Sequence, residues 1–168
     1  MTSYVINDVP LIFQDNNNAC WYAGFLMLVA WRRARGRGAV VPNDLDSEAQ
    51  RHRRNDALPW EAVRRIAFEL NLVPVPTSTP VPYPHRLEEW LRQYGPLWTG
   101  GIAVDWAGHQ VGPGHAVVVA GVSHSDSPEM VYVLDPWPMG RGREGWRPFA
   151  HLTTILSGRH DFLHYRGA

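Results

Sequence analysis

The feature that most constrains the fold is a run of thirteen residues, 19–31, in which every side chain is apolar or glycine. A transmembrane helix needs about 20 such residues, so the run is too short to cross a bilayer. It predicts instead a helix that is buried on almost all faces, at the centre of a domain. We expect this helix to continue to about Arg35 and to end at the glycines of 36–38. Asp and Asn side chains at 15–18 can cap its start.

Cys20 is the only cysteine of the chain and stands in the first turn of the predicted helix. The free N–H groups and the dipole of a helix N-terminus favour the thiolate, which is the reactive form of cysteine. Cys20 is therefore a candidate nucleophile, although a free cysteine is also a common core residue. A single cysteine forms no internal disulfide, so the fold is compatible with a reducing compartment.

The composition indicates one globular domain over residues 1–168. Hydrophobic residues make up 45% of the chain and charged residues 19%, values that argue against disorder. The 16 basic and 16 acidic residues cancel, which argues against nucleic acid or a membrane surface as a partner. The N-terminus lacks the pattern of a signal peptide, which predicts a location in the cytoplasm of the producing cell.

The first half of the chain has mainly helical patterns. Apolar residues at helical spacing predict a helix that begins at residues 59–61 and another over 85–94, the latter ended by a Gly-Pro pair. The polar stretch 43–55 predicts a surface helix or turn. Five prolines in 73–84 predict a stiff extended connector.

The second half changes to strand-like patterns. Arg147–Leu156 is ambiguous and can be interpreted as a short helix, while 140–145 is interpreted as a surface loop. Helices followed by strands predict an α+β fold, with a helical lobe over about 14–95 and a mostly antiparallel sheet lobe over about 96–168. The predicted strands are 97–106, 115–123, 130–135 and 161–165.

A histidine and an aspartate, His115 and Asp135, each lie at the edge of a predicted strand. Together with the earlier cysteine, these residue types suggest covalent catalysis by a Cys/His/Asp set. We prefer His115 as the base because a glycine precedes it and an apolar strand follows it. Asp135 can also be a turn former before a proline. The alternatives that stay open are His109 and His124 for the base, and Asp105 and Asp126 for its partner.

No metal or cofactor is expected. The group His109, His115, Asp135 and Cys20 does not have the spacing of a known closed zinc site, and the chain has no HExxH or paired CxxC motif. The glycine pairs at 36–38 and 140–142 lack the strand-turn-helix context and the Gly-Lys ending of a phosphate loop.

Several segments together carry a family resemblance. They are Gln14 with Cys20-Trp21, then Tyr94-Gly95-Pro96-Leu97-Trp98, the segment 114–122 that begins Gly-His-Ala-Val-Val-Val, and Tyr132-Val133-Leu134-Asp135-Pro136. In this order, and over nearly the whole chain, they resemble bacterial papain-like cysteine proteases. The nearest in pattern are the peptidases that process bacteriocin leaders and the stand-alone effectors that bacteria deliver into other cells. Trp21 stands where the leader peptidases usually carry glycine, which favours the effector branch.

The resemblance implies a role for each residue. Cys20 would be the nucleophile, His115 the general base and Asp135 the group that orients the imidazole. The side-chain amide of Gln14 and the backbone N–H of Cys20 would form the oxyanion hole. Candidate substrate-binding residues are Trp21, Trp98 and Trp137, with Trp106 and the 140–145 loop as further possibilities for the cleft walls.

The function that the resemblance implies is that of a papain-like endopeptidase, used as a toxin or effector that cleaves a protein inside a competitor or host cell. Such a protein would be delivered by a specialised secretion system, and an immunity protein that blocks the cleft would protect its producer.

Three other interpretations stay open. A Cys/His/Asp set can act on other amides, as in a peptidoglycan amidase, a deamidase or a transglutaminase-like enzyme, although the Asp-Cys-Ser-Gly sequence of the NlpC/P60 amidases is absent. The chain can also be an inactive papain-like fold that binds a peptide. Finally, it can be a domain of a larger secreted polypeptide.

Overall fold

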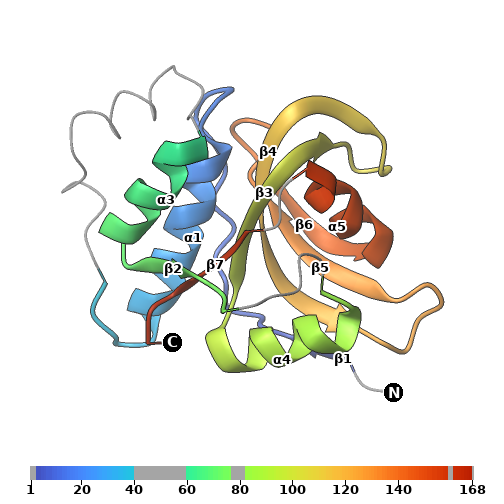
Figure 1. The fold of residues 1–168 in the computed structure, drawn as a ribbon, viewed down its shortest axis with the longest axis horizontal. Coiled ribbons are helices and arrows are strands. Elements are labelled where there is room, and N and C mark those ends of the chain that lie inside the picture. Colours follow the sequence, from blue (N-terminus) through green and yellow to red (C-terminus); the bar gives the residue numbers. More distant parts are fainter. Residues whose placement is uncertain (1–2, 40–59, 77–81, 159–160, 168) are drawn as a thin grey trace.

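The computed structural model describes residues 3–39, 60–76, 82–158 and 161–167, and these residues form an α+β fold around one antiparallel sheet (Figure 1). Helix α1 and helix α3 lie to one side of the sheet and helix α5 to the other. The surface helix or turn predicted for 43–55 and the start of the second helix at residue 59 lie outside the described residues. Within these residues, no helix combines the length and apolarity that a membrane span requires.

Helix α1 spans Cys20–Ala34 and is the central helix of the fold, as the apolar run predicted. It contacts strands β3 and β4, and nine of its residues are buried. Gly36 has a φ of +68° and its N–H bonds the Arg33 carbonyl, which ends the helix where predicted. The predicted Asx cap is wrong, because the N-cap residue is Ala19 and no side chain bonds the first turn. Asn16 Oδ1 instead accepts the N–H of Asn18, which closes an Asx turn before the helix.

The two further predicted helices are present. Helix α3 spans Trp60–Glu69 and helix α4 spans Pro84–Tyr94, with Gly95 as its C-cap. The extended connector begins with a short strand, β2 (Leu72–Pro74). Residues 77–81 of the connector lie outside the described residues.

The sheet is antiparallel throughout and has the order β2-β7-β3-β4-β5-β6, with β1 also paired to β4. Three of its strands, β1, β2 and β6, were not predicted. Residues 143–148 form β6 on the edge of the sheet next to β5, and helix α5 begins only at Phe149, so the loop and helix predictions for 140–156 were each partly wrong. The strands are β1 (Ser3–Val5), β3 (Leu97–Val104), β4 (Gln110–Ser123), β5 (Met130–Asp135), β6 (Arg143–Pro148) and β7 (Phe162–Tyr165).

The predicted lobe boundary near residue 95 does not separate the sheet from the rest of the chain. Strand β1 pairs with β4, and β2 pairs with β7, so both halves of the sequence contribute strands. Helix α4, which was assigned to the helical lobe, contacts β4. These pairings join segments far apart in the sequence, and no local sequence pattern predicts them.

An aromatic group joins α1 to the sheet. The indole N–H of Trp98 donates to the Trp21 carbonyl over 3.2 Å, and the Trp98 ring lies 5.1 Å from the ring of Phe25. This packing requires glycine at position 24, where a Cβ would lie 2.6 Å from Trp98 Cδ1. Both tryptophans belong to the core, with 4% of Trp21 and 1% of Trp98 exposed.

The contact between β3 and α5 predicts a sensitive site at Gly101. A Cβ at this position would lie 1.9 Å from the backbone oxygen of Ile155, so Gly101→Ala must push the helix away from the sheet. We expect this change to lower the free energy of unfolding by about 1–3 kcal/mol. Gly112→Ala is the matched control, because its nearest neighbour would lie at an ordinary 3.5 Å. Thermal unfolding of both variants tests this; equal melting temperatures would contradict it.

Candidate active site

Cys20 is the first residue of α1 and faces a cavity. The thiol is partly exposed, so a substrate can reach it. As the first helical residue, Cys20 has a backbone N–H without an acceptor inside the helix. The positive end of the α1 dipole lies at this residue.

His115 and Asp135 come from the neighbouring strands β4 and β5 and are hydrogen-bonded to each other. The distance from His115 Nε2 to Asp135 Oδ1 is 2.6 Å. Both side chains are largely buried, with 13% of His115 and 4% of Asp135 exposed. Because Nε2 is used by the carboxylate, Nδ1 is the nitrogen left for the thiol of Cys20, which lines the same cavity. The structure thus brings the three predicted residues together.

The charge of the His115 imidazole depends on the residues around it. Burial by itself would lower the pKa of His115, but the hydrogen bonds to Asp135 and Cys20 and their charges outweigh burial and raise it to about 10. His115 is therefore an imidazolium at neutral pH. This imidazolium can act as a general acid beside the cysteine.

Asp135 is held by three donors, two of which the sequence analysis missed. Its Oδ1 also accepts the backbone N–H of Trp137 over 2.9 Å, and its Oδ2 accepts Arg143 Nε over 3.2 Å. The guanidinium of Arg143 in turn lies 4.6 Å from the ring centre of Trp106. A buried carboxylate needs such donors to remain charged. The only signal for Arg143 in the sequence is a basic residue shortly after the aspartate, which is too common to be informative.

Gln14 is buried and lies in the wall of the same cavity. Its backbone is bonded to the loop after β5, through Gln14 N to Pro136 O at 3.2 Å and Gly140 N to Gln14 O at 3.1 Å. The side-chain Nε2 donates to Asn16 O over 2.6 Å, which leaves its second hydrogen for another acceptor. Gln14 and Cys20 thus line one cavity, and each carries an N–H donor.

The cavity has a volume of about 210 Å³ and contains all four predicted residues. Of the three tryptophans proposed to bind substrate, only Trp137 lines it, with 42% of its surface exposed. The prediction for Trp21 and Trp98 is wrong, because both are core residues that α1 and β3 bury against each other. Trp106 is held between the guanidinium groups of Arg143 and Arg147.

The rival candidates lie elsewhere or have other partners. His109 is exposed and bonds Asp105, which lies in the cavity wall. His124 bonds two glutamates beyond the far end of β4, and Asp126 accepts the hydroxyl of Ser123. A larger groove of about 610 Å³ runs along β1 and α4. It contains no cysteine or histidine, so the smaller cavity is the candidate active site.

Comparison with known proteins identifies the family. No curated protein matches the chain. A family model described as "Papain-like cysteine protease AvrRpt2" matches residues 4–153, which include every residue of the site described above. The chain therefore belongs to the papain-like cysteine protease family of AvrRpt2 and is a cysteine protease.

Proposed function

We propose that this protease cleaves a protein through a Cys20/His115/Asp135 triad, with the Gln14 amide and the Cys20 N–H as the oxyanion hole. The observation that carries the proposal is the hydrogen-bonded His115–Asp135 pair, which shares one cavity with the only cysteine of the chain. The family supports the peptidase chemistry.

In this mechanism the Cys20 thiolate attacks the scissile carbonyl carbon, and the carbonyl oxygen takes up the negative charge between the two oxyanion donors. As the tetrahedral intermediate collapses, His115 Nδ1 gives its proton to the leaving amine, which departs and leaves a thioester on Cys20. His115 then accepts a proton from water, whose oxygen attacks the thioester. Collapse releases the new carboxyl group and the thiol, and Asp135 keeps the imidazole in position throughout.

We further propose that the protein acts as a bacterial effector or toxin within a target cell, since the matching family is that of an effector-type protease. Its substrate would be a protein of that cell. A cognate immunity protein that occupies the cavity is the expected safeguard of a producer that makes a toxin of this kind. Such a protein, purified with the enzyme, should form a complex and stop cleavage.

The test is to express the wild-type protein and Cys20→Ala inside bacterial cells and compare the new protein N-termini by mass spectrometry. We expect N-termini that occur with the wild type alone, and these would name the substrate. Toxicity without new N-termini would point to another amide chemistry. Equal effects of the two proteins would overturn covalent catalysis and favour peptide binding.

The role of Asp135 predicts a graded response to substitution. Asp135→Ala removes the acceptor of His115 Nε2, and we expect kcat/KM to fall by about 10²–10⁴-fold. Asp135→Asn should lose less of its kcat/KM, because an amide oxygen can still accept the N–H of an imidazolium. The amide NH₂ would then face Arg143. Steady-state kinetics on the identified substrate measure both. Equal losses in the two variants would show that orientation of the imidazole is not what Asp135 supplies.

The raised pKa of His115 predicts the alkaline behaviour of the enzyme. The rate should fall as pH rises through about 10, since the imidazolium that protonates the leaving amine is lost. The same pair should stabilise the fold fully below about pH 6.5, the ordinary histidine pKa, and lose this contribution as pH rises through about 10. Rate and unfolding profiles against pH test this. Asp135→Asn lacks the carboxylate charge, so the alkaline fall in rate and the alkaline fall in stability should both move to lower pH. If neither fall moves, the Asp135 carboxylate is not what raises the pKa of His115.

A further inference from the structure

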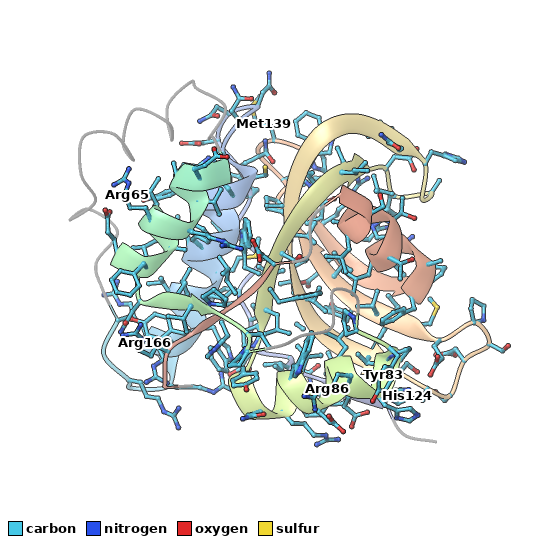
Figure 2. All side chains as sticks on the ribbon, in the orientation of Figure 1. Arg65, Tyr83, Arg86, His124, Met139 and Arg166 are labelled. Atoms are coloured by element: carbon cyan, nitrogen blue, oxygen red, sulfur yellow. The ribbon has the colours of Figure 1, made fainter. Side chains whose placement is uncertain are left out.

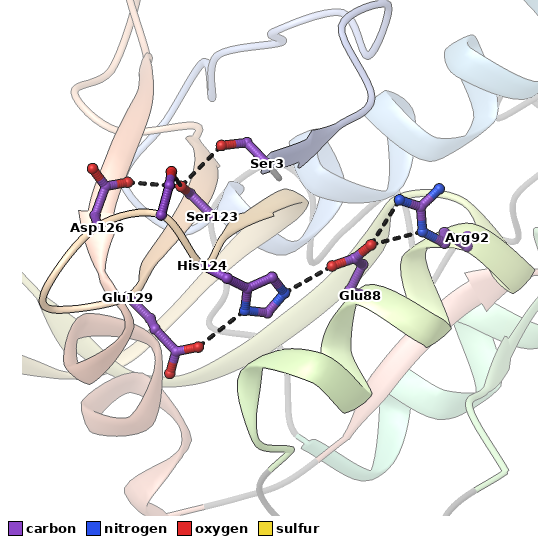
Figure 3. A network of polar contacts seen from close by, with 8 residues as sticks. Ser3, Glu88, Arg92, Ser123, His124, Asp126 and Glu129 are labelled. Carbon is purple, nitrogen blue, oxygen red and sulfur yellow. Dashed lines mark hydrogen bonds and ion pairs between the residues drawn. The ribbon is translucent and has the colours of Figure 1, made fainter. Parts of the chain in front are cut away.

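A second group of ionisable side chains lies where α4 meets the turn between β4 and β5 (Figure 3). His124 directly follows β4, and its imidazole lies between two carboxylates. Its Nδ1 is 2.9 Å from Glu129 Oε1, and its Nε2 is 2.7 Å from Glu88 Oε2. Figure 2 shows His124 at the opposite end of the molecule from Met139, which belongs to the loop that carries Trp137. This group is therefore separate from the active-site cavity.

The group contains a donor set suited to a metal ion. His85, His124 and Glu129 each offer one ligand atom, and the three atoms lie within 4.8 Å of one another. The imidazole of His85 is exposed and stacks on that of His124, with ring centres 4.2 Å apart. Two imidazole nitrogens and one carboxylate oxygen, with water in the fourth position, are a donor set that Zn²⁺ takes in proteins.

The surroundings of His124 also have the form that a metal-binding histidine requires. A histidine that ligates a metal through one nitrogen almost always donates its other ring N–H to a carboxylate, which fixes the ring. With Nδ1 on a metal, His124 Nε2 would donate to Glu88, to which it is already bonded. Glu88 is held in turn by Arg92 through an ion pair of 2.7 Å, as Figure 3 shows.

We propose that His85, His124 and Glu129 form a site for a divalent cation, with Zn²⁺ as the ion that fits the donors best. The cation takes the place of the proton between His124 Nδ1 and Glu129, and that proton passes to solvent. Tetrahedral bonds of about 2.0–2.1 Å put donor atoms about 3.4 Å apart. The His85 nitrogen, which lies within 4.8 Å of the other two ligand atoms, must therefore approach them by about 1.4 Å at most. His124 Nδ1 and Glu129 Oε1, now 2.9 Å apart, must separate by about 0.5 Å. Rotation of the exposed His85 side chain away from the stack accommodates most of this change.

A cation at this site would stabilise the fold and take no part in peptide hydrolysis. It would join the start of α4 to the turn between β4 and β5, two segments that the bonds of His124 to Glu88 and Glu129 already connect. Binding to the folded state alone stabilises that state, so the cation should raise the melting temperature without entering the reaction. Glu88 is a positioning residue in this arrangement, because it acts on the metal only through His124.

The test uses Cys20→Ala as the parent protein, because the thiol and imidazole of the active site would themselves bind zinc. Isothermal titration with Zn²⁺ is expected to give one site, a higher melting temperature, and, with Co²⁺, visible absorption bands of a tetrahedral complex. Adding His85→Ala should weaken binding at least about tenfold, and adding Glu88→Gln by about 10–100-fold. The metal-free melting temperature of each variant shows whether it is folded.

His109→Ala is the matched control, since His109 is an exposed histidine beside a carboxylate that lies outside the group. It should leave the zinc affinity unchanged. The proposal is overturned if the parent binds no Zn²⁺, or if His85→Ala binds it as tightly as the parent does. It is likewise overturned if His109→Ala weakens binding as much as His85→Ala, because zinc would then adhere to surface histidines in general.

Discussion

Cys20→Ala is expected to abolish peptide-bond hydrolysis, with a loss of at least about 10⁴-fold in kcat/KM. The substitution removes the atom that forms the thioester, and within the described residues no other nucleophile lies beside His115 in the cavity. Because the thiol is only partly buried, the melting temperature should change little. Cleavage of a substrate peptide, followed by mass spectrometry, measures the loss.

Two controls make this result specific. A thiol-alkylating reagent should add one group to the wild-type protein and none to Cys20→Ala, since Cys20 is the only cysteine. The modified wild type should be as inactive as the variant. Residual cleavage by Cys20→Ala at more than about a hundredth of the wild-type rate would contradict a covalent mechanism, because the oxyanion hole and substrate binding alone supply far less than the nucleophile does.

Trp98→Ala is expected to lower the free energy of unfolding by about 3–5 kcal/mol. The side chain is 1% exposed, packs against Gly24 and Phe25 of α1, and gives its N–H to the Trp21 carbonyl. Its removal leaves a cavity between the central helix and the sheet, and an acceptor without its donor. Denaturant unfolding measures the loss, while KM of the fraction that remains folded should stay close to that of the wild type.

Trp137→Ala is the matched counterpart, in which the same side chain is removed from the cavity wall. Trp137 is 42% exposed, so its loss should alter the free energy of unfolding by no more than about 0.5 kcal/mol. We expect KM to rise, because the indole is the large apolar surface at the site. A rise in KM for Trp98→Ala without a loss of stability would contradict the placement of Trp98 in the core. An unaltered KM for Trp137→Ala would contradict contact between Trp137 and the substrate.

Local patterns predicted most elements of the fold but not how they associate. The apolar run predicted α1 to within one residue at its start, and the strand-like run 130–135 is strand β5. Strand β6 was missed because its residues, Arg143 to Pro148, are polar or half-buried and gain their structure from pairing with β5. The places of β1 and β2 depend on pairing with β4 and β7, which a local pattern does not contain.

The candidate active site was likewise only partly predictable from local sequence patterns. Cys20, His115 and Asp135 could be selected from residue type and chain order. Cys20 begins α1 and Asp135 ends β5 as predicted, but His115 lies inside β4, which begins at Gln110 and not at His115. Arg143 and the Trp137 N–H could not, since their contact with Asp135 depends on the path of the loop after β5. Trp98 was misplaced because a strand sequence does not reveal which of its faces a helix covers.

The bonds between the Gln14 segment and the loop after β5 also bear on when the site is assembled during folding. They join Gln14, the proposed oxyanion-hole residue, to the loop that follows Asp135. Strands β4 and β5 must already have met for His115 to lie beside Asp135. A nascent or partly folded chain therefore carries its thiol without a working site. We therefore expect proteolysis only from the folded protein, and a molecule that unfolds should lose its activity.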